Sequence, residues 1–162
     1  MSHRSFAFPM PAPAEVVFDA FHYHQWRHRW DSLVSATAVE GGAPCPHVGA
    51  ITQNAGGGWM RKLSMRTQFV AYDRPRVAAA SMVGQSFPFT CWAASMRHKD
   101  LGDGQSVLLY TYTFEVGPPC IAWMIRPVVE RVFDYQTRKR FERLRAFLSN
   151  HAQEIARWQQ ER

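Results

Sequence analysis

Residues 106–116 read Ser-Val-Leu-Leu-Tyr-Thr-Tyr-Thr-Phe-Glu-Val, and this stretch predicts a β-strand more clearly than any other part of the chain. β-Branched, aromatic and aliphatic residues fill almost all of it, and these residue types favour the pleated surface of a sheet. Because alternate residues of a strand point the same way, Tyr110, Tyr112 and Phe114 share one face. We expect that face to point inward, since the opposite face carries threonines and Glu115.

The chain before this strand also shows the residue types that favour strands, and turn-forming residues interrupt it at intervals. Gly41-Gly42, Gly56-Gly57-Gly58 and Gly102-Asp103-Gly104 are typical of tight turns. The three consecutive glycines lack the Lys-Ser/Thr ending of a phosphate-binding loop, so we interpret them as a hairpin turn. Sequential strands joined by short turns favour an antiparallel meander. The predicted strands are 3–10, 34–40, 48–54, 59–72, 76–85, 89–99 and 106–116.

Apolar residues at a spacing of three and four predict helices at both ends of the meander. Two short helices are expected after the first strand, from 13 to about 24 and near 26–32. A long helix of roughly 30 residues, or about 45 Å, is expected over about 128–157. Pro127 suits its first turn, where proline is tolerated. The sequence therefore predicts an α+β fold with one strand, two short helices, six strands and a long helix.

The composition limits the class of protein. The 162 residues correspond to about one domain, and 14% aromatic with 20% charged residues argues against intrinsic disorder. Cys45, Cys91 and Cys120 form no Cys-x-x-Cys pair, which favours free thiols in a reducing compartment. The start of the chain shows no signal peptide, and no apolar stretch approaches the roughly 20 residues of a membrane span. We expect a cytoplasmic protein without stable membrane insertion.

Five short segments occur in an order that resembles the START-like, or helix-grip (SRPBCC), superfamily, and in particular its polyketide cyclase/dehydrase-type branch. The resemblance covers about residues 5–150. In one segment Arg74 stands where the family has a proline, and this departure leaves the resemblance intact. The five segments are Pro13-Ala14-Glu15-Val16-Val17-Phe18, Trp26 through Trp30-Asp31, Tyr72-Asp73-Arg74-Pro75-Arg76, Asp103-Gly104, and Arg140-Phe141-Glu142-Arg143-Leu144.

The resemblance implies a single START-like ligand-binding domain over residues 1–162. In that family a curved antiparallel sheet of about seven strands wraps around the long C-terminal helix and leaves a deep apolar cavity. Members include carriers of hydrophobic molecules, ubiquinone-binding chaperones, lipid transfer proteins and cyclases. The resemblance therefore implies binding of a small hydrophobic ligand without naming it.

We predict the residues that would contact such a ligand from strand alternation and from the inner face of the long helix. Tyr110 and Tyr112 are weak catalytic candidates, whose phenols would polarise a carbonyl-rich ligand; the alternative is that both are core aromatics. The predicted ligand-binding residues are Met82, Trp92, Met96, Tyr110, Tyr112, Phe114, Phe133 and Thr137.

Histidines offer two further candidates, and we interpret both as structural. His98 lies between Arg97 and Lys99, so we expect a solvated side chain rather than a general base. His22, His24 and His28 form the densest cluster of histidines, but no Cys, Asp or Glu completes a set of metal ligands. We expect a polar helix face there, and predict no metal and no other cofactor.

The sequence leaves three functions open. The first is a carrier or sensor that binds a hydrophobic, polyketide-like or lipid molecule, and the second is a polyketide cyclase or dehydratase. The third is an interaction module that docks through its basic helix, because residues 126–145 hold seven basic and three acidic side chains. Aromatic residues are not interleaved with these bases, so we predict no nucleic-acid binding. A homodimer remains possible.

Overall fold

The computed structural model describes residues 1–32, 34–56 and 64–162, and these form seven strands and three helices. Gly57 and Gly58 of the predicted turn, and residues 59–63 of the predicted strand, lie outside the described residues. The elements are β1 (Ser2–Met10), α1 (Ala14–His22), α2 (His24–Arg27), β2 (Val34–Val39), β3 (Ile51–Gly56), β4 (Ser64–Asp73), β5 (Val77–Met82), β6 (Phe89–Gly102), β7 (Gln105–Val116) and α3 (Pro119–Gln160).

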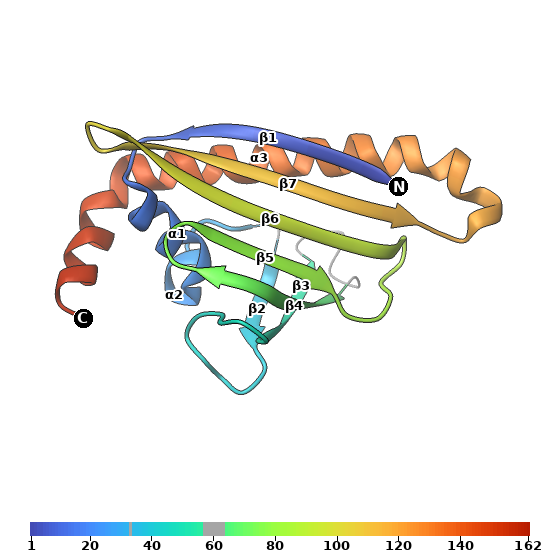
Figure 1. The fold of residues 1–162 in the computed structure, drawn as a ribbon, viewed down its shortest axis with the longest axis horizontal. Helices are drawn as coiled ribbons and strands as arrows, with labels where there is room; N and C mark the ends of the chain where they lie inside the picture. The colour runs from blue at the N-terminus through green and yellow to red at the C-terminus, as the bar shows by residue number, and fades with distance from the viewer. Residues whose placement is uncertain (33, 57–63) are drawn as a thin grey trace.

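The strands form a single antiparallel sheet in the order β1-β7-β6-β5-β4-β3-β2. Strands β2 to β7 follow one another as the predicted meander, and β1 pairs with β7 at the far edge. The sheet curves around one side of α3, which runs behind β1 and β7 along the length of the molecule (Figure 1). This arrangement confirms the predicted α+β helix-grip fold.

Strand β7 alternates as predicted. Its inward face is buried along its whole length, and the side chains of Tyr112 and Phe114 are completely inaccessible to solvent. Leu109, on the opposite face, is 41% exposed. Phe133 of α3 packs edge-on against both Tyr112 and Phe114, with ring centroids 4.7 and 5.7 Å away. Such aromatic contacts fix α3 against the sheet.

The two short helices close one end of the curved sheet (Figure 1). Pro13 precedes α1, and Glu15 lies in its first turn, where a carboxylate interacts favourably with the helix dipole. Helix α1 contacts α3 as well as β6 and β7. The Trp30 indole, just after α2, donates a hydrogen bond of 2.9 Å to the carbonyl of Ala20. This hydrogen bond holds the segment after α2 against α1.

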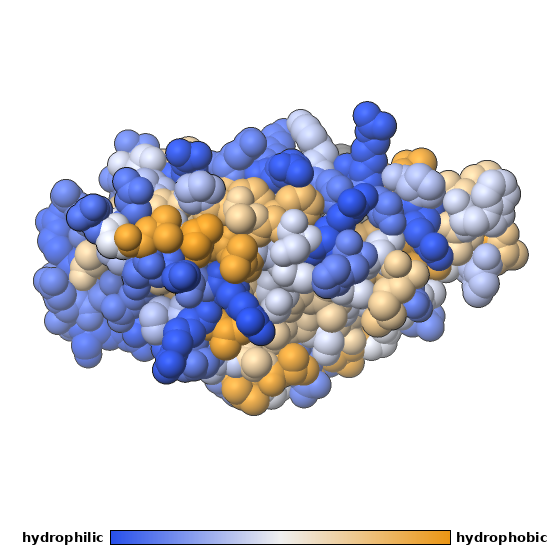
Figure 2. Space-filling model, turned by 45° about the horizontal axis from the view of Figure 1, so that its top comes forward, coloured by the Kyte–Doolittle hydropathy of each residue, from blue (hydrophilic) through white to orange (hydrophobic). Residues whose placement is uncertain are grey.

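Helix α3 begins at Pro119, nine residues before the predicted start. Pro119 occupies the first helical position, where a missing N–H costs nothing, so Pro127 falls inside the helix rather than in its first turn. The early turns project beyond the sheet and leave Trp123 75% exposed. Figure 2 shows this projecting right-hand end coloured pale to orange, whereas the left-hand end is mostly blue. Among the helices of the described residues, none has the length and apolar character required to cross a membrane.

Candidate functional site

A cavity of about 730 Å³ lies between the inner face of the sheet and α3. This volume is in the range of about 300–1,000 Å³ that is typical of small-molecule sites. Side chains from both short helices, from strands β3 to β7 and from α3 line it. The described lining residues include no Asp or Glu, and most of them are apolar.

Alanines on β5 and β6 leave the space for this cavity. Ala78, Ala80 and Ala94 all line it, and Ala80 is paired with Ala94 across the two strands. A larger apolar side chain at these inward positions would extend toward α3 and fill the gap. Sequence reasoning missed these residues because it searched for large aromatic side chains, although Ala78-Ala79-Ala80 and Ala93-Ala94 are plain in the sequence.

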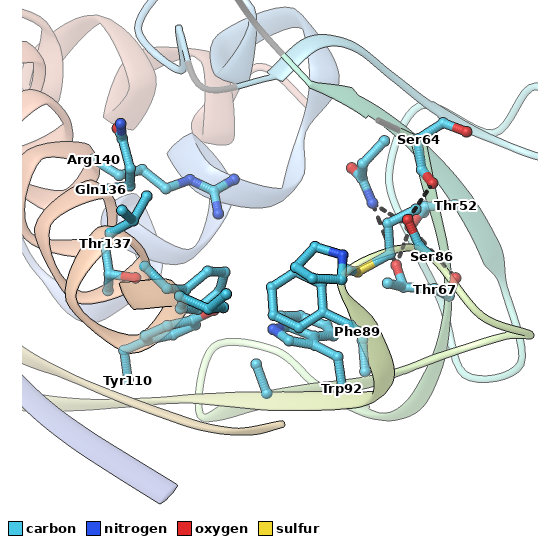
Figure 3. A pocket seen from close by; sticks show the side chains of 18 of the residues that line it. Thr52, Ser64, Thr67, Ser86, Phe89, Trp92, Tyr110, Gln136, Thr137 and Arg140 are labelled. Atoms are coloured by element: carbon cyan, nitrogen blue, oxygen red, sulfur yellow. Dashed lines mark hydrogen bonds between the residues drawn. The ribbon is translucent and has the colours of Figure 1, made fainter. Parts of the chain in front are cut away.

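The structure places five of the eight predicted ligand-binding residues in the cavity wall. They are Trp92, Met96, Tyr110, Phe133 and Thr137. Figure 3 shows Trp92 beside Phe89 in the middle of the cavity, and Tyr110 with Thr137 at one end. The buried indole Nε1 of Trp92 has no hydrogen-bond partner within the described residues.

Met82, Tyr112 and Phe114 are not among the residues that line the cavity. Met82 is half-buried near the end of β5, and its pairing with Thr67 puts it on the cavity side of the sheet. The Tyr112 hydroxyl donates a hydrogen bond to Oδ1 of Asp134, and burial raises the pKa of this phenol. The phenol therefore interacts with a carboxylate of α3 rather than with the cavity.

Charged side chains meet at the end of the cavity nearest α2. Oδ2 of Asp31 accepts a 3.0 Å hydrogen bond from Nε of Arg27 and a 3.1 Å hydrogen bond from Nε of Arg140. Both guanidinium groups lie 4.8 Å from the ring centroid of Phe21. Although burial opposes ionisation of Asp31, the two arginines hold the pKa of its carboxyl below the usual value. Arg27 and Arg140 line the cavity, so the basic character of α3 is not confined to its outer face.

His22 lines the cavity and is almost completely buried, which contradicts its prediction as part of a polar helix face. Its Nδ1 lies 2.9 Å from the carbonyl oxygen of Phe18. A carbonyl only accepts hydrogen bonds, so Nδ1 carries the proton and Nε2 is left as an acceptor. Burial lowers the pKa of His22 well below 6.5, which keeps the ring neutral at physiological pH.

The end of the cavity near β3 and β4 carries uncharged polar groups. The Thr52 and Thr67 hydroxyls lie 2.8 Å apart, and the Asn54 amide donates a 3.4 Å hydrogen bond to each of them. Nearby, the Ser86 hydroxyl donates to the carbonyl of Ser64. Figure 3 shows these groups opposite Arg140, Gln136, Thr137 and Tyr110, with Phe89 and Trp92 between them. The cavity therefore has one charged end, one uncharged polar end and an apolar middle.

The prediction of a solvated His98 is wrong. His98 is 8% exposed, and its ring lies 5.3 Å from that of Phe18. Both ring nitrogens are buried without a hydrogen-bond partner among the described residues, and burial lowers the pKa of His98 to about 4. His98 follows Met96 by two positions and therefore shares its inward face, whereas Arg97 and Lys99 point outward.

The other histidines of the cluster near α2 differ from one another in burial. His28 is exposed, whereas His24 is half-buried and burial lowers its pKa to about 4. Their rings stack 6.1 Å apart. Over residues 1–32, 34–56 and 64–162, no three His, Cys, Asp or Glu side chains are grouped so that they could hold a metal ion.

The cavity is open to solvent near the start of α3. Phe87, Met124 and Val128 line it and are 68%, 55% and 64% exposed. They come from the connection between β5 and β6 and from the early turns of α3. A ligand that entered here would pass an apolar rim.

Comparison with known proteins agrees with this architecture. Among curated proteins, none matches the sequence significantly. The Zhui aromatase/cyclase from Streptomyces sp. R1128 superimposes with a TM-score of 0.76 at 10% identity, over 93% of this chain and 94% of that chain. A norcoclaurine synthase from Thalictrum flavum gives 0.64 at 12% identity over 93% and 95%. A START superfamily protein from Mycobacterium smegmatis gives 0.65 at 14% identity over 86% and 94%.

These identities are low, so the structural matches establish a shared fold and not a shared activity. The sequence adds an independent match, because residues 5–148 fit the model of the family described as polyketide cyclase/dehydrase and lipid transport. This range covers the sheet except the first residues of β1, both short helices and most of α3. The resemblance found in five short segments is confirmed: the chain belongs to the START-like polyketide cyclase/dehydrase and lipid transport family.

Proposed function

We propose that the protein binds a small hydrophobic molecule in the cavity between the sheet and α3, as a carrier or sensor. The observation that carries this proposal is the cavity of about 730 Å³ with an apolar, aromatic middle. Burial of apolar ligand surface contributes roughly 25 cal/mol per Å², so such walls favour an apolar ligand. Three free cysteines support a reducing, cytoplasmic location.

The titratable groups of the cavity favour binding over catalysis. General acid–base catalysis is most efficient when the pKa of the group lies near the working pH. Burial raises the pKa of Tyr110 to about 12, so its phenol is a hydrogen-bond donor and a poor acid. The pKa of His22 is lowered well below 6.5, so its imidazole is a weak base. These two groups suit recognition of ligand oxygen atoms.

A cyclase or dehydratase is the second candidate, because the donor Tyr110 and the acceptor His22 line the same cavity. The structural match to an aromatase/cyclase also supports it. Turnover of a poly-β-ketone substrate, with Tyr110→Phe and His22→Gln as variants, separates the two functions. Turnover that both variants abolish supports the enzyme, whereas binding without turnover supports the carrier.

Fluorescence titration with N-phenyl-1-naphthylamine, a neutral probe that emits strongly in apolar surroundings, tests the proposed function directly. We expect saturable binding with one probe per chain. Native mass spectrometry of the purified protein should show the same stoichiometry with the probe added. A protein that neither binds the probe nor retains any small molecule would refute the proposal.

A further inference from the structure

The arginines at the charged end of the cavity have donors that the protein does not use. Asp31 engages Nε of Arg27, and Nε and Nη2 of Arg140. Within residues 1–32, 34–56 and 64–162, no hydrogen bond engages either terminal nitrogen of Arg27 or Nη1 of Arg140. Three guanidinium nitrogens are thus available on side chains that line the cavity.

The same end also carries an excess of one positive charge. Two arginines share a single carboxylate, and the side chains of Arg27, Asp31 and Arg140 are only 10%, 1% and 16% exposed. No other acid compensates, since no Asp or Glu occurs among the described residues of the cavity wall. Buried charges are normally paired, because removing an ion from water costs several kcal/mol. Burial and the neighbouring Arg140 lower the pKa of Arg27 to about 10, which is consistent with incomplete compensation.

We propose that Arg27 and Arg140 bind a carboxylate group of the cavity ligand, whose apolar part lies against Trp92 and Phe133. This inference rests on the proposed function and adds the class of ligand: an apolar acid rather than a neutral molecule. Guanidinium groups match the planar geometry of a carboxylate through paired hydrogen bonds. The Tyr110 phenol, a donor at physiological pH, faces the same end. The opposite end, with hydroxyl and amide groups, accommodates neutral polar substituents.

A competition experiment tests this preference. N-Phenyl-1-naphthylamine is bound first and is then displaced by dodecanoate or by dodecanol, which has the same chain length and no charge. Hydrogen bonds to charged groups are stronger than those between neutral groups, so we expect dodecanoate to displace the probe at concentrations lower by about tenfold or more. Equal displacement by both compounds would overturn the inference and leave the three charged residues as a structural connection between α2 and α3.

A variant of Arg27 locates the effect. Arg27→Met removes the excess charge but keeps the Asp31–Arg140 pair. The Asp31 carboxylate is therefore paired in the variant as it is in the wild type. We expect the preference for dodecanoate over dodecanol to disappear in this variant. Arg145→Met, which removes an exposed charge from the same helix, is the matched control and should keep the preference.

The outcomes separate the two proposals. Loss of probe binding in the wild type would contradict the proposed function itself, whereas probe binding without a preference for the carboxylate would contradict only the inference. A preference that persists unchanged in a folded Arg27→Met variant would also contradict it. If that variant does not fold, the wild-type comparison of dodecanoate with dodecanol still decides the question.

Discussion

Arg74, in the turn between β4 and β5, forms a two-pronged ion pair with Asp19 of α1. Its Nε and Nη2 atoms donate hydrogen bonds of 2.7 and 2.6 Å to the two carboxylate oxygens, and the Asp19 side chain is completely buried. This pair joins one end of the sheet to α1. The fold is the one predicted despite this departure from the family's proline, and the arginine adds a buried contact between the turn and α1.

Arg74→Ala should destabilise the protein, because it leaves the Asp19 carboxylate buried with the Gln159 amide as its one side-chain partner among the described residues. We expect the free energy of unfolding to fall by about 2–3 kcal/mol, since breaking a buried ion pair is costly and Arg74 is partly exposed. Urea denaturation measures the change. Arg76→Ala is the control: that exposed arginine pairs with exposed Asp73, and its loss should cost less than about 0.5 kcal/mol. Equal effects of the two substitutions would contradict this role of Arg74.

Ala94→Phe should weaken ligand binding strongly without unfolding the protein. The new ring would occupy the cavity space opposite Ala80, and filling a cavity is better tolerated than overpacking a solid core. Titration with N-phenyl-1-naphthylamine should show at least a tenfold weaker affinity. Ala93→Phe, one position away on the opposite face of β6, should bind the probe as the wild type does. Unchanged affinity in the Ala94 variant would show that the probe binds elsewhere.

The two tyrosines of β7 should respond differently to loss of their hydroxyl groups. Tyr112→Phe removes the hydrogen bond to Asp134 and should lower the free energy of unfolding by about 1–2 kcal/mol without changing probe binding. Tyr110→Phe removes a donor from the cavity wall and should weaken binding of a carboxylate ligand such as dodecanoate. Thermal melting and the displacement titration measure the two effects. The reverse pattern would contradict these assignments.

The strands and the inward face of β7 were predictable because each depends on local alternation. Tyr110 and Tyr112 lie on one face whatever the rest of the chain does, and turn residues separate the strands. The division of that face between cavity and core was not predictable. Tyr112 and Phe114 lie under Phe133, and this contact depends on where α3 crosses the sheet. The predicted absence of nucleic-acid binding and a possible homodimer stay predictions.

The charged end of the cavity could not be found from sequence spacing. Asp31 and Arg140 are 109 residues apart, and only the packing of α3 against the segment after α2 brings them together. Arg140 belongs to a run of basic residues that begins with the exposed Arg138, so nothing local marks it as buried. The start of α3 was missed for a different reason: both Pro119 and Pro127 fit a first turn, and the choice between them depends on tertiary structure.

His98 makes the stability of the protein dependent on pH. Its pKa is lowered to about 4 in the folded state, whereas the unfolded chain protonates near 6.5. Between these values the unfolded state binds more protons, so stability is complete above pH 6.5 and is lost as the pH falls. The loss from His98 amounts to about 3 kcal/mol at most, because each pKa unit corresponds to about 1.4 kcal/mol.

Urea denaturation of wild type and His98→Leu from pH 7 to pH 4 should give curves of unfolding free energy against pH that converge or cross, with the shallower slope in the variant. Asp31 and His24 titrate in both proteins and cancel in this comparison, whereas His22 interacts with His98 and is part of the measured difference. Parallel curves would mean that His98 is not the group responsible.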